Sequence, residues 1–333
     1  MVPKHTPNTQ QPRKKCRLAV FLCLHFIALF SAPLHATEPD NEKPAPQPNI
    51  AVLAPLDSSH DTVAKQVINF ANWLDNFFGD ERVYDESQKS HLKLNLRYIS
   101  EKGNSPRYQA NLQGKLTLPH TQKRLKLLLE SDPGENPSTS NTVVEALESQ
   151  EQSIGLRYIQ YSSDWLRAHT DAGIRFHSGL DPFVRFRLRG IFTFGHWNLR
   201  AAETLFWRKS SEPGETTQLD IERGLSKDLL FRSTSSATWL DKTQQFDMGQ
   251  NFYLFHTINP YRAVIYRAGL SAVSEPQTHT TGYVLSVRLR QQIHRDWLFF
   301  EINPKVLYPE EENFSPQRSL TLKLEVLFGG VKR

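Results

Sequence analysis

Apolar and polar residues alternate along most of the chain between His91 and Phe328. In residues 90–99, SHLKLNLRYI, leucine and tyrosine occupy every second position, and basic or amide side chains occupy most of the positions between them. Residues 107–118 and 319–328 repeat the pattern. Because successive side chains of a strand point to opposite faces, each such segment predicts a strand with one apolar and one polar face.

The alternation predicts about fourteen strands, within a range of roughly twelve to sixteen, most of them about 9 to 14 residues long. Strands of ordinary soluble domains average about 5 or 6 residues, whereas a tilted strand needs about 9 to 11 to cross a bilayer. Short connections, such as SSD at 162–164 and Gly195, alternate with longer ones, such as 133–151. This sorting predicts an all-β fold, a single antiparallel up-and-down transmembrane barrel with short periplasmic turns and longer outer loops.

The residues before the barrel change period. Val63, Val67, Phe70, Leu74 and Phe77 recur at spacings of three and four, which places them on one face of a helix. We therefore expect an amphipathic helix and lead-in over 60–90, docked in the lumen or left in the periplasm. Residues 37–59, rich in Pro, Asn and Glu near their start, are expected to form a flexible linker.

The N-terminus has the pattern of a secretory signal peptide. Five basic residues and no acid occur within residues 1–17, and the apolar run LAVFLCLHFIALF follows at 18–30. This run is shorter than the roughly 20 residues that span hydrocarbon, and it leads into the small residues before Ala36. We expect cleavage after Ala36, so that residues 91–333 form an exported barrel. Both cysteines, Cys16 and Cys23, belong to the leader.

Removing the leader changes how the charge of the chain is interpreted. The whole chain has 40 basic and 35 acidic residues, a net charge of +5. Residues 1–36 contribute five bases and no acids, so the mature protein has 35 of each and nucleic acid is not an expected partner. Within it, residues 37–90 carry ten acids and four bases, and residues 91–333 therefore carry an excess of six bases. The acidic lead-in predicts contact with the interior or the periplasmic mouth of the barrel.

These features resemble those of Gram-negative outer-membrane β-barrel proteins of the porin-like type. The resemblance covers about residues 91–328 and includes the aromatic-ended terminal strand, LTLKLEVLF at 320–328. It implies residence in the outer membrane after export, contact with outer-membrane lipid, and assembly by the barrel-assembly machinery. It also implies a channel or binding protein as the first functional class.

The polar face of the strands is dense in arginine and would line the lumen. The sequence VRFRLRG places three arginines on one strand face, and neighbouring strands add more. Guanidinium groups stay charged and bind carboxylate or phosphate in a bidentate manner, so they favour small anionic solutes. The predicted anion path consists of Arg167, Arg175, Arg185, Arg187, Arg189, Arg288 and Arg290. His169 and Asp171 share a face and are predicted to form a lumen pair.

Two other functional classes stay open. Paired charges could fill the lumen and make a closed structural or surface-interaction barrel, because buried charges must be paired or hydrated. An outer-membrane enzyme acting on lipid or lipopolysaccharide is the other alternative, but no serine lies on the strand face of His169 and Asp171. No nucleophile elbow, Gly-rich phosphate loop or metal-binding histidine pair is found in the sequence. We predict no catalytic residue, no metal and no cofactor.

Overall fold

The computed structural model describes most of the chain from His91 onward and a few residues before it. The described residues are 73–74, 77–78, 91–117, 124–130, 152–176, 179–210, 212–295 and 297–328. The predicted signal peptide, the linker, the long loop at 133–151 and most of the predicted helix at 60–78 lie outside them. Of that helix, Trp73, Leu74, Phe77 and Phe78 are described and are helical.

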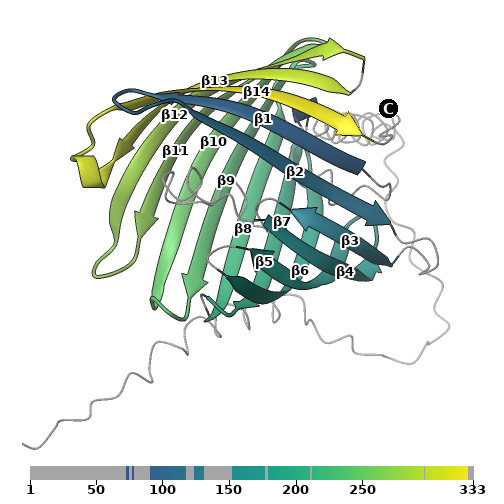
Figure 1. Ribbon diagram of the computed structural model, residues 1–333. Helices are drawn as coiled ribbons and strands as arrows, with labels where there is room; N and C mark the ends of the chain where they lie inside the picture. The colour runs from purple at the N-terminus through teal and green to yellow at the C-terminus, as the bar shows by residue number, and fades with distance from the viewer. Residues whose placement is uncertain are drawn as a thin grey trace, which may run out of the picture. The chain divides into compact units, whose positions relative to one another are not determined.

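From His91 onward, the described residues form fourteen strands and one short 3-10 helix (Figure 1). The strands are β1 (His91–Glu101), β2 (Arg107–Thr117), β3 (Leu125–Glu130), β4 (Gln152–Ser162), β5 (Leu166–Phe176), β6 (Leu180–Phe194), β7 (Trp197–Arg208), β8 (Glu212–Gly224), β9 (Leu229–Leu240), β10 (Gln245–Asn259), β11 (Arg262–Val273), β12 (His279–His294), β13 (Leu298–Pro309) and β14 (Gln317–Phe328). The helix η1 (Glu310–Glu312) lies in the connection between β13 and β14. Thirteen of the strands have 11 to 16 residues, so each is long enough to cross a bilayer at a tilt.

The strands close into a barrel. Each strand pairs antiparallel with its neighbours in sequence, and β1 pairs with β14 through ten residue pairs, from Leu92 opposite Phe328 to Glu101 opposite Ser319. The fourteen-strand up-and-down barrel predicted from the alternation is therefore confirmed. Closure leaves no strand edge exposed, as a sheet surrounded by hydrocarbon requires.

The strand β3 is the shortest of the fourteen. It has six residues and pairs with β2 through four residue pairs, from Gly114–Leu129 to Thr117–Lys126. Leu127, Leu128 and Leu129 are consecutive, so a leucine here occupies the inner face as well as the outer one and the period is weak at this point.

The two faces of the wall have opposite character. Leu96, Leu156 and Trp207 point outward and are 43%, 44% and 45% exposed, whereas the inward-facing Asn95, Asp171 and Arg290 are 1%, 0% and 0% exposed. Polar residues thus fill the interior, and apolar residues cover the outside. This arrangement is the reverse of that of a soluble globular protein and suits a wall that faces lipid.

Candidate functional site: the charged lumen

One side of the lumen, formed by β4 to β7, is strongly basic. Its inward-facing side chains include eight arginines and two aspartates, and we call this surface the arginine wall. Its arginines are Arg157, Arg167, Arg175, Arg185, Arg187, Arg189, Arg200 and Arg208, and its aspartates are Asp171 and Asp181. The strand period of two produces the wall, because charged residues recur at alternate positions of four adjacent strands.

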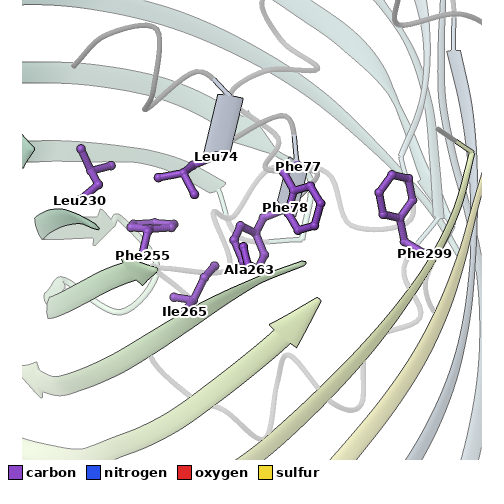
Figure 2. Packing of buried hydrophobic residues seen from close by; sticks show 8 residues of the cluster. All are labelled: Leu74, Phe77, Phe78, Leu230, Phe255, Ala263, Ile265 and Phe299. Carbon is purple, nitrogen blue, oxygen red and sulfur yellow. The ribbon is translucent and has the colours of Figure 1, made fainter. Parts of the chain in front are cut away.

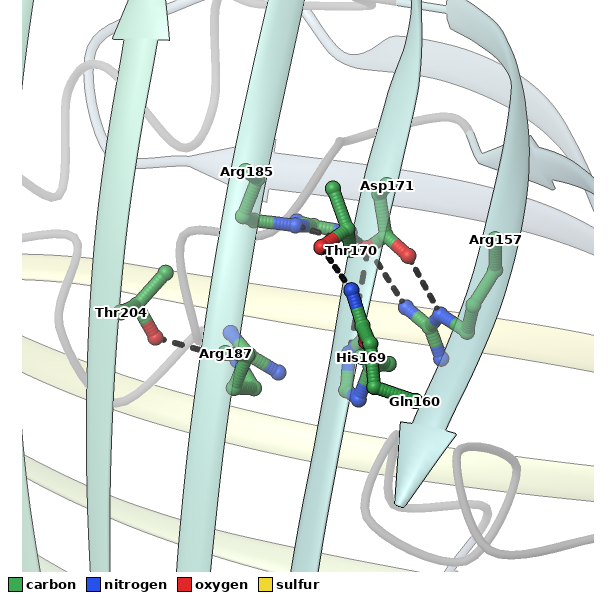
Figure 3. Close-up of polar contacts among 8 residues, drawn as sticks. All are labelled: Arg157, Gln160, His169, Thr170, Asp171, Arg185, Arg187 and Thr204. Carbon is green, nitrogen blue, oxygen red and sulfur yellow. Dashed lines mark hydrogen bonds and ion pairs between the residues drawn. The ribbon is translucent and has the colours of Figure 1, made fainter.

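Asp171 lies at the centre of the arginine wall and binds two arginines (Figure 3). The register places it directly opposite Arg157 on β4 and Arg185 on β6. Arg157 donates Nε–H to Oδ1 at 2.7 Å and a terminal N–H to Oδ2 at 2.9 Å. Arg185 donates to Oδ2 at 3.0 and 2.6 Å. One carboxylate is thus shared by two guanidinium groups.

Arg187 and Arg189 lie next to this cluster on β6 and are half-buried. The cross-strand neighbours of Arg187 are His169 and Thr204, and its Nε–H donates to Thr204 Oγ1 at 3.1 Å. Arg189 lies between Arg167 and Ala202 in the register. No carboxylate is directly opposite either residue on these two neighbouring strands.

His169 and Asp171 are close in space. His169 Nε2 lies 3.9 Å from Asp171 Oδ2, and both side chains face the lumen. The carboxylate already accepts four hydrogen bonds from Arg157 and Arg185. It is therefore committed to two cations, which favours a structural role for the pair over a catalytic one.

Arg290, on β12, belongs to a different kind of cluster. It is fully buried and donates to Glu301 Oε1 and to Glu325 Oε1, while Lys323 Nζ lies 2.9 Å and 3.1 Å from the other oxygens of the two glutamates. Within these four residues two cations are matched by two carboxylates, and we call them the neutral cluster. This geometry favours a role for Arg290 in tying β12, β13 and β14 together.

A third charged cluster joins β7, β8 and β9. Arg232 donates Nε–H to Glu222 Oε1 at 2.6 Å, and Arg200 Nε lies 3.7 Å from Glu222 Oε2. Thr234 donates its hydroxyl to Asp220 at 2.6 Å. Because adjacent strands supply the partners, these contacts tie β7, β8 and β9 together. They also place charged groups in the lumen.

An apolar patch interrupts the polar lining near the short turns at the periplasmic end predicted from the sequence. We call it the lumen floor, and it consists of Leu230, Phe255, Ala263, Ile265 and Phe299. These residues share the inward parity of Arg232, Arg267 and Glu301 on their strands. Sequence reasoning missed them, because it assigned apolar side chains to the lipid face. They could have been recognised in the sequence, because they occupy the alternate strand positions that otherwise carry polar residues. They also lie next to the short turns at 225–228, 260–261 and 295–297.

Residues from before the barrel pack on the lumen floor (Figure 2). Leu74, Phe77 and Phe78 are 0%, 3% and 4% exposed. The ring of Phe77 meets Phe299 edge-on with centroids 6.0 Å apart, and that of Phe78 meets Phe255 at 6.2 Å. The guanidinium of Arg290 lies 4.1 Å from the ring centroid of Phe299 and 5.9 Å from that of Phe77. Aromatic and cation–π contacts therefore hold this segment inside the barrel.

The seven predicted path residues divide into groups. Arg185 is paired with Asp171, and Arg175 Nε lies 3.3 Å from Asp181 Oδ2. Arg290 belongs to the neutral cluster, and its neighbour Arg288 lies opposite Ile265 of the lumen floor. The remaining three are Arg167, Arg187 and Arg189, which lie side by side on β5 and β6.

The described residues also bear on metal sites and on membrane-spanning helices. No group of three or more His, Cys, Asp or Glu side chains among them could hold a metal ion. Within the same part of the chain, no helix has the length and apolar character needed to cross a membrane.

We expect the substitution Asp171→Asn to destabilise the barrel by about 3–5 kcal/mol, because it leaves Arg157 and Arg185 buried without their shared carboxylate. The measurement is the urea midpoint of unfolding from lipid vesicles, read from the heat-modifiable mobility of the folded barrel on a gel. Glu311→Gln removes an acid from the exposed η1 and serves as the control. Equal midpoints for the two variants would contradict a stabilising role for the cluster.

Comparison with known proteins shows similarity at the level of solved structures only. No family model and no curated protein matches the chain. The KdgM porin in complex with disordered oligogalacturonate covers 71% of this chain and 99% of its own, with 8% identity and a TM-score of 0.35. The outer membrane channel DcaP of Acinetobacter baumannii covers 72% and 96%, with 9% identity and a TM-score of 0.42. A loop L8 deletion mutant of OmpT of Vibrio cholerae covers 72% and 98%, with 7% identity and a TM-score of 0.46.

These identities are far below 25% and the TM-scores are below 0.5, so the architecture is assigned from the strand pairing of this chain itself. Fourteen antiparallel strands close through β1 and β14, an apolar surface faces outward, and a charged lining faces inward. By its topology and by the character of its two faces, the chain is a closed up-and-down β-barrel of the kind that crosses a membrane with its strands.

Proposed function

We propose that this protein is an outer-membrane channel for small anionic solutes. The observation that carries the proposal is the arginine wall, whose four adjacent strands contribute eight inward-facing arginines and two inward-facing aspartates, with Glu222 of β8 close to Arg200. Positive potential along a lumen raises the local concentration of anions and lowers the barrier to their entry. Arg167, Arg187 and Arg189 form the proposed contact surface for solute.

Export and membrane insertion form part of the same proposal. A cleaved leader at residues 1–36 would deliver the chain to the periplasm, and the barrel-assembly machinery would insert it. The exterior then contacts outer-membrane lipid. An even number of strands leaves both ends of the barrel on the periplasmic side, where Leu74, Phe77 and Phe78 meet the lumen floor.

Those packed residues also support a second candidate function, a closed structural barrel. Leu74, Phe77 and Phe78 occupy the lumen, and the neutral Arg290 cluster lies against them. In the channel reading, this packing is a closed state that opens when the segment leaves. In the structural reading, the segment stays in place permanently.

Conductance and ion selectivity in planar bilayers distinguish the two candidates. We expect the mature chain, residues 37–333, to show discrete conductance steps and a reversal potential of anion-selective sign in a KCl gradient. The absence of steps, in preparations whose folding is verified by heat-modifiable mobility, would favour the closed barrel. A cation-selective reversal potential would remove anionic solutes from the proposal.

A further inference from the structure

The outer face of the barrel carries a polar patch where the rest of that face is largely apolar. We call it the outer polar patch, and it consists of Glu203 on β7, Glu215 and Thr217 on β8, Ser233 and Ser235 on β9, and Gln250 on β10. All six side chains point outward, because they alternate along their strands with inward-facing residues. Glu203 alternates with the buried Thr204, the two serines flank the buried Thr234, and Gln250 precedes the buried Asn251.

Hydrogen bonds link the members of the patch. Thr217 donates its hydroxyl to Glu203 Oε2 at 2.8 Å. Gln250 accepts from the Ser235 hydroxyl at 2.5 Å and donates an amide N–H to Ser233 Oγ at 2.9 Å. The carboxyl group of Glu215 is close enough to interact with that of Glu203. These bonds satisfy part of the hydrogen-bonding capacity of the side chains, since each carboxylate and the amide can form several more.

The patch lies in the middle of its strands. On β7, Glu203 lies six residues after Trp197 and four before Trp207, and both tryptophans share its parity. On β9, Ser235 lies four residues from both Phe231 and Trp239. On β10, Gln250 lies four residues after Phe246. Because aromatic residues of such barrels gather at the two membrane interfaces, the patch falls at hydrocarbon depth.

Lipid is a poor cover for this surface. Polar and charged side chains on the lipid face are costly near the bilayer midplane, and unsatisfied polar groups have no partner in hydrocarbon. Elsewhere the same face presents residues such as Leu112, Leu156, Val184 and Leu285, which are 43%, 44%, 46% and 52% exposed. A protein surface that offers donors and acceptors at the same depth would remove the cost.

The patch is complementary to itself. Its β7–β8 half carries the carboxylates Glu203 and Glu215, whereas its β9–β10 half carries the hydroxyl and amide groups of Ser233, Ser235 and Gln250. A two-fold axis along the membrane normal, between β8 and β9, brings the β7–β8 half of each copy against the β9–β10 half of the other. Donors then meet acceptors twice, as an isologous interface requires.

We propose that the outer polar patch is the contact surface with a second copy of this chain in the membrane. Ala201 and Ala237 lie on the same face within the patch, and their small side chains allow the two walls to approach closely. The inference rests, like the proposed function, on the barrel crossing a membrane. It is independent of whether the lumen conducts anions.

Single-cysteine cross-linking tests the contact. The expected mature chain contains no cysteine, so Ser235→Cys introduces a single thiol at the predicted axis. We expect copper-phenanthroline oxidation of the full-length protein, expressed in its own outer membrane, to give a covalent dimer of Ser235→Cys. The matched control is Leu285→Cys on β12, which is also outward-facing and 52% exposed. Its dimer yield should be severalfold lower.

A second variant distinguishes a stable dimer from random encounters between barrels in the membrane. Glu203→Leu combined with Gln250→Leu makes the patch apolar and compatible with lipid, so folding should persist by heat-modifiable mobility while the dimer in lipid nanodiscs is lost. Equal cross-linking at the two cysteines, or a wild-type chain that is monomeric in nanodiscs, would overturn the proposal. In either case, unchanged anion-selective conductance leaves the channel proposal standing.

Discussion

Alanine in place of Phe77 and Phe78 is expected to open the channel. The two rings pack against Phe299 and Phe255 of the lumen floor and supply the ring contacts between the N-terminal segment and the barrel. Truncating a buried phenylalanine costs about 3–5 kcal/mol, and every 1.4 kcal/mol changes an equilibrium about tenfold. The docked state should therefore lose at least about a hundredfold in population relative to the undocked one.

The measurement is open probability in planar bilayers at fixed voltage. We expect long closed intervals in the wild type and nearly continuous conductance in Phe77→Ala/Phe78→Ala. Deleting residues 37–85 should have the same effect, because it removes the whole segment. The control is Phe314→Ala, which truncates an exposed phenylalanine packed on Tyr283 outside the lumen. Identical conductance in the deletion variant and the wild type would contradict the hypothesis that the N-terminal segment closes the lumen.

Glutamate in place of Arg187 and Arg189 is expected to weaken or reverse anion preference. The two residues are half-buried on β6, and the neighbouring strands place no carboxylate directly opposite them. The double substitution changes the charge of the arginine wall by four units. At separations of several ångströms in a hydrated lumen, this is worth on the order of 2 kcal/mol for a passing ion, or about a thirtyfold change in the permeability ratio.

Arg185 is left intact in this experiment for a physical reason. It shares the buried Asp171 with Arg157, and a glutamate there would place two carboxylates together and disturb folding. The reversal potential in a KCl gradient reports the result. Lys227→Glu combined with Lys242→Glu makes the same change in net charge at exposed turn positions and should leave selectivity almost unaffected. A reversal potential equal to that of the wild type would remove Arg187 and Arg189 from the solute path.

Alternation along the chain was sufficient to predict the barrel. Side-chain direction in a strand depends only on local backbone geometry. The alternation in residues 90–99 and 319–328 therefore predicts strands with one apolar and one polar face, whichever strands they pair with. Strand length and the sorting of loops then indicated a membrane-spanning, closed sheet.

Pairing between strands could not be predicted in the same way. Arg290 meets Glu325, 35 residues away, because β12, β13 and β14 align in one register. Arg187 and Arg185 are two residues apart and look equivalent in sequence, yet register gives Asp171 to Arg185 and Thr204 to Arg187. Which arginines lie opposite a carboxylate therefore depends on a register that periodicity does not encode.

The sequence by itself determined the class of fold, the division into an apolar outer and a charged inner face, and the wealth of arginine on the inner one, because each follows from the period of two. Only the tertiary structure decided which arginines lie opposite a carboxylate, that Leu74, Phe77 and Phe78 lie on an apolar floor within the lumen, and that polar residues from four strands converge on the outer face. Those features arise from side chains that are distant in sequence and are brought together by closure and register.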